Sequence, residues 1–138
     1  MEKGDIELVV SDAILNFPKT VDKPVILFLE KKRFSHMLDM MDLKKHLSKT
    51  PCFVAEMKGG NVIYFCEDIV NHLTKGFHRD NKKKFVEAVT LHELFHIWNN
   101  FKVRNSEEAM FSENLVWSEM KKIYPEHFKF LIKFVKKR

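Results

Sequence analysis

The sequence predicts an α+β fold in a single domain that spans residues 1–138. Three observations lead to this prediction. Apolar residues recur at three- and four-residue spacing over most of the chain, which is typical of amphipathic helices. Two short regions instead contain apolar runs of strand length. With 138 residues, 45% hydrophobic, and only four Gly and four Pro, the chain can bury one core and shows no linker or repeat.

The first third of the chain is predicted to form a helix, a strand and a second helix. The apolar spacing predicts a helix over residues 5–17, which Pro18 ends. Pro24 opens the continuous apolar run Val25–Leu29, which suits a strand in a sheet covered on both faces. A stripe of Phe, Met and Leu then predicts a helix over residues 33–48, with core packing as its main use.

A β-hairpin is predicted next, from two apolar runs on either side of Gly59-Gly60. A two-residue turn at these glycines needs positive φ, which glycine adopts readily. Counting outward from this turn gives the pairs Met57 with Val62, Ala55 with Tyr64, and Phe53 with Cys66. Cys52 and Cys66 then point to opposite faces, so we expect two reduced thiols.

The second half is predicted to be helical. A short helical segment around residues 67–75 leads into a loop that contains Gly76. A long helix follows over residues 80–102, apolar on most of its circumference. Ser106 is a suitable N-cap for a helix that extends to Tyr124, and Pro125 can begin the last helix. The predicted domain is therefore a short mixed sheet packed against the 80–102 helix, with further helices at the C-terminal end.

Composition limits the classes of function. The N-terminal residues lack the apolar core of a signal peptide, and no apolar run is long enough to span a bilayer, so we expect a cytoplasmic protein without a membrane partner. The net charge of +5 favours acidic partners only weakly. The sequence contains no recognisable nucleic-acid-binding module, and this absence argues against nucleic-acid binding.

The segment His92-Glu-Leu-Phe-His96 is an H-E-x-x-H motif inside the long predicted helix. Residues four apart lie on one side of a helix, so both imidazoles can bind one Zn²⁺ and leave a position for water. Glu93 lies beside this pair, where a carboxylate can act as the general base on zinc-activated water. The alternative is two structural histidines, which would then be buried in an apolar helix without a compensating partner.

A catalytic zinc site needs a third protein ligand, and the next helix offers four glutamates. Helical phase places Glu113 near the middle of the apolar side, Glu108 and Glu119 at its margin, and Glu107 outside it. An antiparallel helical hairpin would also bring residue 113 level with residue 96. We therefore predict that Glu113 is the third ligand, and Glu108 remains the alternative.

These residues resemble the gluzincin clan of zinc peptidases. His92-Glu-Leu-Phe-His-Ile-Trp98 is similar to the H-E-x-x-H-x-W stretch of the aminopeptidase branch, and Ser112-Glu113 takes the place of its Asn-Glu. The resemblance covers roughly residues 85–120. It implies a minimal zincin fold, in which a sheet whose edge strand binds extended substrate lies above the active-site helix. The hairpin at residues 52–66 would then supply that strand.

The sequence also departs from this clan. Trp117 stands where an acidic residue often follows the ligand glutamate, and the exopeptidase signature G-x-M-E-N is absent. The segment 106–112 is similar to the E-x-x-A-x-x-F-A segment of small metallopeptidases that cleave repressors, and this alignment favours Glu108 as the ligand.

The sequence therefore predicts a zinc metalloendopeptidase that acts on peptide or protein substrates. The main alternative is a non-enzymatic binding or regulatory protein that retains the zincin fold. A side chain that stabilises the oxyanion is also expected, and the residues leave this choice open. The candidates are Tyr64, Tyr124, His72, His78 and His127.

Overall fold

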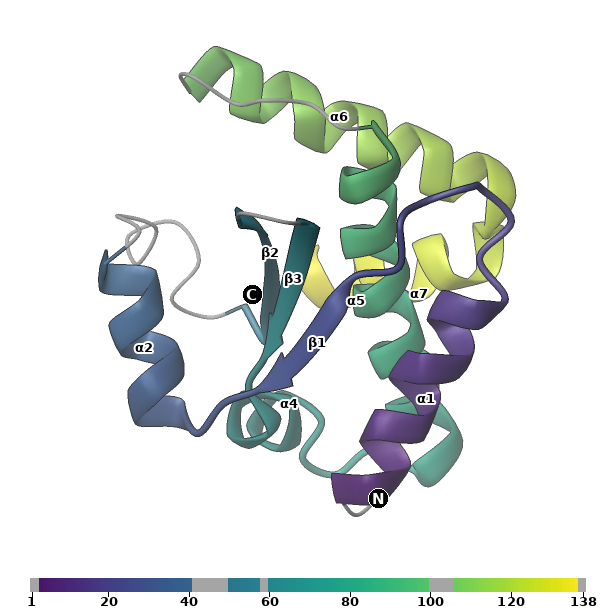
Figure 1. Ribbon diagram of the computed structural model, residues 1–138. Helices are drawn as coiled ribbons and strands as arrows, with labels where there is room; N and C mark the ends of the chain where they lie inside the picture. The colour runs from purple at the N-terminus through teal and green to yellow at the C-terminus, as the bar shows by residue number, and fades with distance from the viewer. Residues whose placement is uncertain (1–2, 41–49, 58–59, 100–105, 137–138) are drawn as a thin grey trace. The chain divides into compact units, whose positions relative to one another are not determined.

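The computed structural model describes residues 3–40, 50–57, 60–99 and 106–136. This part of the chain is mixed α+β, as predicted, with six helices and a three-stranded sheet (Figure 1). The elements in chain order are α1 (Lys3–Leu15), β1 (Val25–Phe28), α2 (Lys31–Met40), β2 (Cys52–Met57), β3 (Gly60–Phe65), α4 (Glu67–Leu73), α5 (Arg79–Asn99), α6 (Ser106–Ile123) and α7 (Pro125–Lys136).

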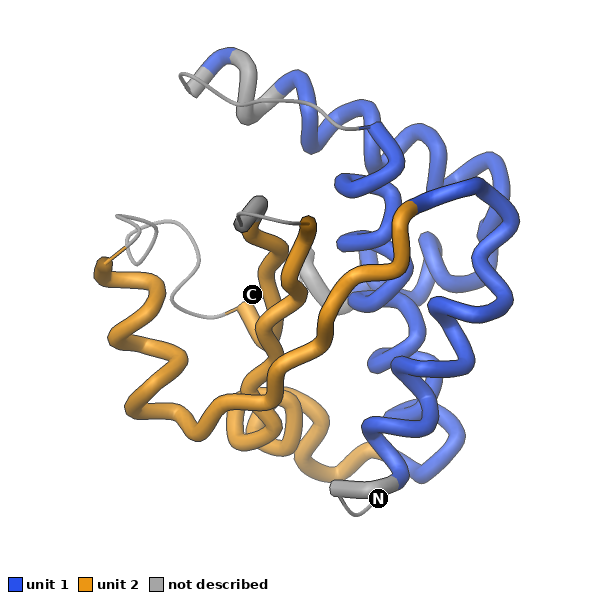
Figure 2. The backbone as a smooth tube through the Cα atoms, in the orientation of Figure 1, with its two compact units in different colours: residues 1–21, 78–138 blue, residues 22–77 orange. Residues whose placement is uncertain are grey.

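The chain divides into two compact units (Figure 2). Unit 1 combines residues 1–21 with residues 78–138, and unit 2 consists of residues 22–77. Unit 1 holds α1, α5, α6 and α7, whereas unit 2 holds the sheet, α2 and α4. The H-E-x-x-H segment therefore belongs to an all-helical unit that is discontinuous in sequence.

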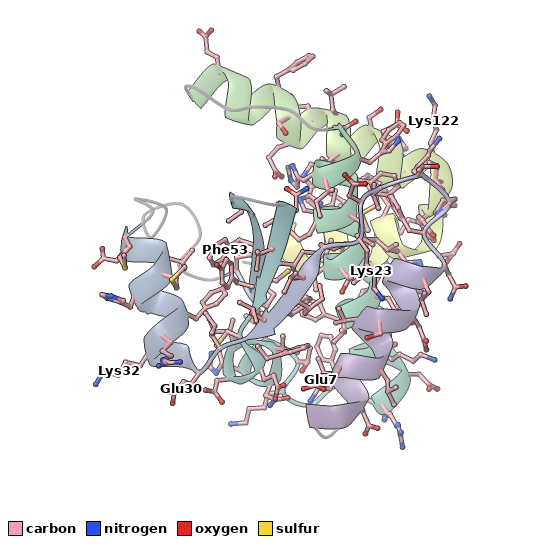
Figure 3. All side chains as sticks on the ribbon, in the orientation of Figure 1. Glu7, Lys23, Glu30, Lys32, Phe53 and Lys122 are labelled. Atoms are coloured by element: carbon pink, nitrogen blue, oxygen red, sulfur yellow. The ribbon has the colours of Figure 1, made fainter. Side chains whose placement is uncertain are left out.

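The sheet of unit 2 has the strand order β1-β3-β2. β1 runs parallel to β3, and β2 runs antiparallel to it, so the predicted mixed sheet is confirmed. One face buries an apolar cluster against α2, built on Phe34, Leu38, Phe53 and Tyr64. Phe53 points from β2 toward α2 (Figure 3), and its ring centroid lies 5.2 Å from that of Phe34 and 5.1 Å from that of Tyr64. These aromatic contacts fix α2 on the sheet.

The predicted register of the hairpin was wrong by two residues. Met57 pairs with Gly60, Ala55 with Val62 and Phe53 with Tyr64. Gly60 therefore takes a ladder position opposite Met57, with φ of 145°, which side-chain-bearing residues rarely adopt. A slip of two leaves every side chain on its predicted face, because strand side chains alternate with a period of two. Cys52 and Cys66 are both buried, and they form no disulfide in the described part of the chain.

The expectation that β1 is covered on both faces was also wrong. β1 forms an edge of the sheet and pairs only with β3 among the described strands. Its residues alternate in exposure, and Val25 and Leu27 are 57% and 42% exposed. Ile63, Tyr64 and Phe65 of the central strand β3 are all buried instead. Continuous apolar sequence did not distinguish the edge strand from the central one.

The helix boundaries follow the prediction within a few residues. α1 begins at Lys3 and ends at Leu15, two residues before the predicted end. α2 begins at Lys31, and residues 41–48 of the predicted helix lie outside the described residues. Residues 100–102 of the predicted 80–102 helix also lie outside them. The positions of α4, α6 and α7 agree with the sequence-based expectations.

α5 is the central helix of unit 1 and contacts α1, α6 and α7. It buries residues around most of its circumference, as predicted: Phe85, Val86, Ala88, Val89, Thr90, Leu91, Glu93, Leu94 and Phe95. The hydroxyl of Thr90 donates a hydrogen bond to the Val86 carbonyl at 2.7 Å, which compensates the burial of that group. α6 crosses α5 at a steep angle (Figure 1), so the predicted antiparallel hairpin of helices was wrong.

Candidate metal centre

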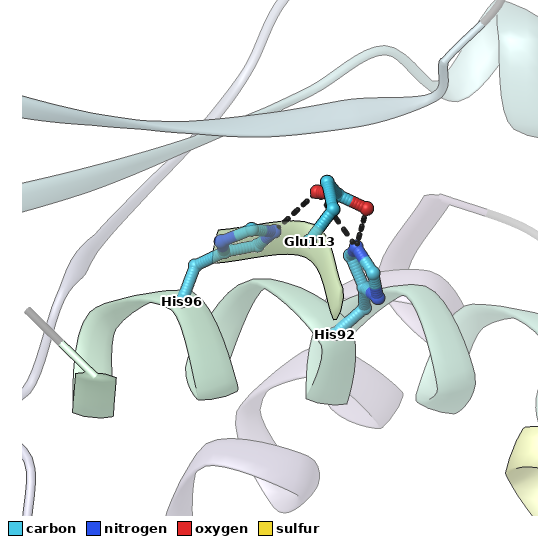
Figure 4. A group of neighbouring side chains, drawn as sticks. All are labelled: His92, His96 and Glu113. Atoms are coloured by element: carbon cyan, nitrogen blue, oxygen red, sulfur yellow. Dashed lines mark hydrogen bonds and ion pairs between the residues drawn. The ribbon is translucent and has the colours of Figure 1, made fainter. Parts of the chain in front are cut away.

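His92 and His96 rise side by side from α5 (Figure 4). Four residues advance a helix about 40° beyond one full turn, so both imidazoles leave the same side. Their ring centroids are 4.9 Å apart, with an angle of 76° between the ring planes. Leu91, Leu94 and Phe95 on the flanking positions are buried, which fixes the rotation of α5 about its axis.

Glu113 of α6 reaches both histidines (Figure 4). Its Oε1 lies 2.6 Å from Nε2 of His96, and its Oε2 lies 3.3 Å from Nε2 of His92. The fully buried Val116 and Met120 hold this side of α6 in place. The structure thus brings together the three predicted ligands, although they come from two helices. Their role as metal ligands stays a prediction.

The group is strongly coupled electrostatically. Burial alone would raise the pKa of the Glu113 carboxyl, but hydrogen bonds and positive charge from His92 and His96 hold that pKa well below its usual range. Burial alone would lower the pKa of His96. The hydrogen bond to Glu113 and the negative charges of Glu93 and Glu113 outweigh burial, so the pKa of His96 is raised above its usual value. Glu113 is therefore ionised at neutral pH.

The donor atoms suit a divalent metal ion such as zinc. Two imidazole nitrogens and one carboxylate oxygen lie within 4.8 Å of one another. A tetrahedral zinc ion with bonds of about 2.0–2.1 Å separates its donor atoms by about 3.3 Å. Oε1 of Glu113 lies 3.4 Å from Nε2 of His92, which already matches this spacing, and 2.6 Å from Nε2 of His96, which must widen slightly. The residues fit the ion with a small side-chain movement.

Two further residues of α6 surround the histidines. The hydroxyl of Ser112 lies 3.3 Å from Nδ1 of His96, and Ser112 is 4% exposed. The ring of Trp117 lies over His92, with centroids 4.6 Å apart. The sequence predicted a function for neither residue. Helical spacing could have placed Trp117 near the histidines, because it follows Glu113 by four residues and so lies on the same side of the helix.

Glu93, the predicted general base, is 8% exposed and lies on α5 next to His92 in sequence. Its negative charge acts on His96, whose pKa it helps to raise. Glu93 does not belong to the group of three potential ligands. This arrangement agrees with a carboxylate that is close to the proposed metal but does not ligate it.

The other acidic candidates on α6 can be compared with Glu113. Glu107 is exposed and Glu119 is half-buried, and neither belongs to the potential ligand group. Glu108, the alternative third ligand, lies in α6, but its side chain is outside the described part of the structure. Glu113 is thus the one described glutamate of α6 that meets both histidines.

The oxyanion candidates lie in different places. Tyr64 is buried in the sheet of unit 2, and His72 and His78 are exposed. Tyr124 and His127 contact each other in unit 1, with ring centroids 5.6 Å apart, and Nε2 of His127 lies 3.4 Å from Oε2 of Glu87.

Comparison with protein-family models, curated proteins and solved structures finds no match for this chain. The resemblance to gluzincins therefore rests on the segment His92–Trp98 and on Ser112-Glu113, and the zincin fold stays a prediction. No helix among the described residues is both long and apolar enough to cross a lipid bilayer.

Proposed function

We propose that this protein is a zinc-dependent metalloendopeptidase, with His92, His96 and Glu113 as metal ligands. The observation that carries the proposal is the convergence of two Nε2 atoms and a carboxylate, supplied by α5 and α6 (Figure 4). Two histidines and one glutamate are an established ligand set of catalytic zinc. The carboxylate faces two imidazoles in a largely apolar helical unit, where an uncompensated charge is costly, so a cation shared by the three side chains would stabilise it.

Glu93 is the proposed catalytic residue. Bound zinc would supply Lewis acidity, which makes water nucleophilic near neutral pH and polarises a peptide carbonyl. The Glu93 carboxylate would take the proton from that water and deliver it to the leaving amine. Its position on the same helix as both histidines keeps the base at a fixed distance from the two ligands, and its low exposure of 8% limits competing bulk water.

The proposed substrates are peptides or partly unfolded protein segments. The side chain of Glu113 is 46% exposed, whereas those of His92 and His96 are 13% and 18% exposed. The carboxylate side of the group is therefore open to solvent. An open site accepts a chain that continues past it in both directions, which favours endopeptidase over exopeptidase action.

The first test is metal content, measured by mass spectrometry on protein purified without a histidine tag. Near-stoichiometric zinc is expected in the wild type, with loss in His92→Ala and Glu113→Ala. Glu108→Ala separates the two candidate third ligands, and Glu119→Ala is a matched control on the same helix. Failure of the wild type to bind zinc, even after refolding with the metal, would sink the proposal.

The second part of this test uses Glu93→Gln on zinc-loaded protein. We expect unchanged zinc content and a loss of peptide hydrolysis of at least about 10²–10⁴-fold, because a general base contributes this much to the rate. Hydrolysis of unfolded casein provides the readout. Zinc-loaded wild type that shows no hydrolysis would instead favour a binding or regulatory protein that holds a metal.

A further inference from the structure

The two histidines of the candidate centre are held by different kinds of contact. Nδ1 of His96 lies 3.3 Å from the Ser112 hydroxyl, which can fix the ring by a hydrogen bond. Nδ1 of His92 is buried and has no hydrogen-bond partner among the described residues. Metal-binding histidines usually depend on a hydrogen bond at the second ring nitrogen for their orientation. His92 therefore needs another support.

That support is available from a row of aromatic rings contributed by three helices. The Trp117 ring of α6 lies 4.6 Å from the His92 ring of α5, with an angle of 52° between the planes. The ring centroid of Phe128 of α7 lies 6.0 Å from that of Trp117, in a T-shaped contact with an angle of 72° between the ring planes. The ammonium group of Lys121 lies 5.9 Å from the Phe128 ring. Thus Phe128 of α7 packs against Trp117, and Trp117 packs against His92.

The consequence for the centre follows from the geometry of the imidazole. Nε2 of His92 lies 3.3 Å from Glu113, so a modest rotation of the ring would move this nitrogen away from the shared site. At His96 a hydrogen bond at Nδ1 would also resist that rotation, whereas at His92 the contact of Nε2 with Glu113 is supplemented by packing against the Trp117 ring. Trp117 supplies this packing through a close, tilted contact between the two rings.

We propose that Trp117 is a positioning residue that holds the His92 imidazole in its metal-binding orientation. The inference rests on the proposed metal centre and adds a residue outside its ligand set. Trp117 acts through His92 and makes no contact with the metal. Its effect is therefore expected on metal affinity, in the absence of any substrate.

The test compares the zinc dissociation constant of three variants by competition with a chromogenic chelator. Trp117→Leu keeps an apolar side chain but removes the flat ring, and we expect affinity to fall about 10- to 100-fold, as when a supporting partner of a ligand is lost. Trp117→Phe retains an aromatic ring and should stay within about threefold of wild type. Trp98→Leu is the matched control, since Trp98 is also half-buried and contacts Lys19 instead.

A second readout requires no change at position 117. In a Trp98→Phe background, Trp117 is the only tryptophan, since the chain has two. Zinc should change its fluorescence with the same midpoint as the chelator competition, because the metal fixes the adjacent His92 ring. Adding Glu113→Ala to this background should abolish the response at the same zinc concentrations.

Each outcome decides between defined alternatives. Wild-type affinity in Trp117→Leu, or an equal loss in Trp98→Leu, would overturn the role of Trp117 and leave the metal centre intact. Circular dichroism of the metal-free variants shows whether each is folded at the assay temperature. If Trp117→Leu is unfolded, an absent zinc response in the Trp98→Phe protein overturns the proposal. A wild type that binds no zinc would overturn the proposed function, and the role of Trp117 with it.

Discussion

Single residues of this protein show how burial competes with local charge. The Cys66 thiol stands at the N-cap of α4, where backbone amides favour a thiolate. Burial nevertheless raises the pKa of Cys66, with a smaller contribution from the negative charge of Asp68, and the amides of Ile69 and Asp68 offset only part of it. At Glu113 the balance is reversed, because two imidazoles outweigh the desolvation.

This raised pKa predicts a loss of stability at alkaline pH. Because the folded-state pKa of Cys66 lies above its unfolded value of about 8.5, its contribution is fully present below about pH 8.5 and is lost as the pH rises through the folded value. Urea unfolding at pH 7.0 and 9.5 should therefore show a larger drop in unfolding free energy for wild type than for Cys66→Ala. Equal drops in both proteins would contradict this assignment.

The site could be predicted in part from residue patterns. His92, Glu93 and His96 are set by one helix, so their relative positions follow from sequence spacing alone. Glu113 followed from helical phase, although the predicted antiparallel helix pair was wrong. The contacts of Ser112 and Trp117 could not be predicted in the same way, because they depend on the crossing angle of α5 and α6 and on side-chain rotamers.

At the scale of elements, the accuracy of prediction depends on how local the determining interactions are. Helices followed from apolar periodicity, and their observed bounds are close to those expected. The predicted hairpin register was wrong because two registers that differ by two residues are both compatible with the glycine pair. Each side chain keeps its own face of the sheet in either register, so the apolar pattern does not distinguish them. The edge position of β1 depends on its pairing with β3, 37 residues later at Val25↔Val62, which no local pattern encodes.

The packing of α5 gives a prediction about element stability. Phe95 is fully buried, and its ring contacts Phe17 at 5.0 Å and Tyr124 at 6.2 Å, so it joins segments from three parts of unit 1. Phe95→Ala should reduce the unfolding free energy by about 3–5 kcal/mol through lost burial and the remaining cavity. Phe111→Ala, at a residue 53% exposed on α6, should change it by less than about 0.5 kcal/mol. Urea denaturation followed by circular dichroism distinguishes these values, and similar losses at both positions would be inconsistent with the described core.

At the scale of the whole molecule, the chain carries natural probes for each unit. Both tryptophans, Trp98 and Trp117, belong to unit 1 with the candidate metal centre. Both cysteines, Cys52 and Cys66, belong to unit 2 and are buried. Tryptophan fluorescence therefore reports on one unit and thiol accessibility on the other.

These probes test how zinc stabilises the protein. A ligand at 100 times its dissociation constant stabilises the state that binds it by about 2.7 kcal/mol. We expect zinc to move the fluorescence-monitored urea transition to higher denaturant concentration and to move the thiol-labelling transition less. His92→Ala should abolish both shifts. Equal shifts in wild type would show that the two units unfold as one cooperative block.

The discontinuity of unit 1 has a consequence for biosynthesis. α1 packs on α5, although the whole of residues 22–77 separates the two segments that form this unit. A ribosome that adds about 5–20 residues per second takes several seconds to proceed from α1 to the end of α5. During that interval Ile6 and Val10, both buried in the finished protein, lack their partner helix. The nascent chain thus exposes an apolar helix early, and this segment is where we expect a hydrophobic-binding chaperone to associate.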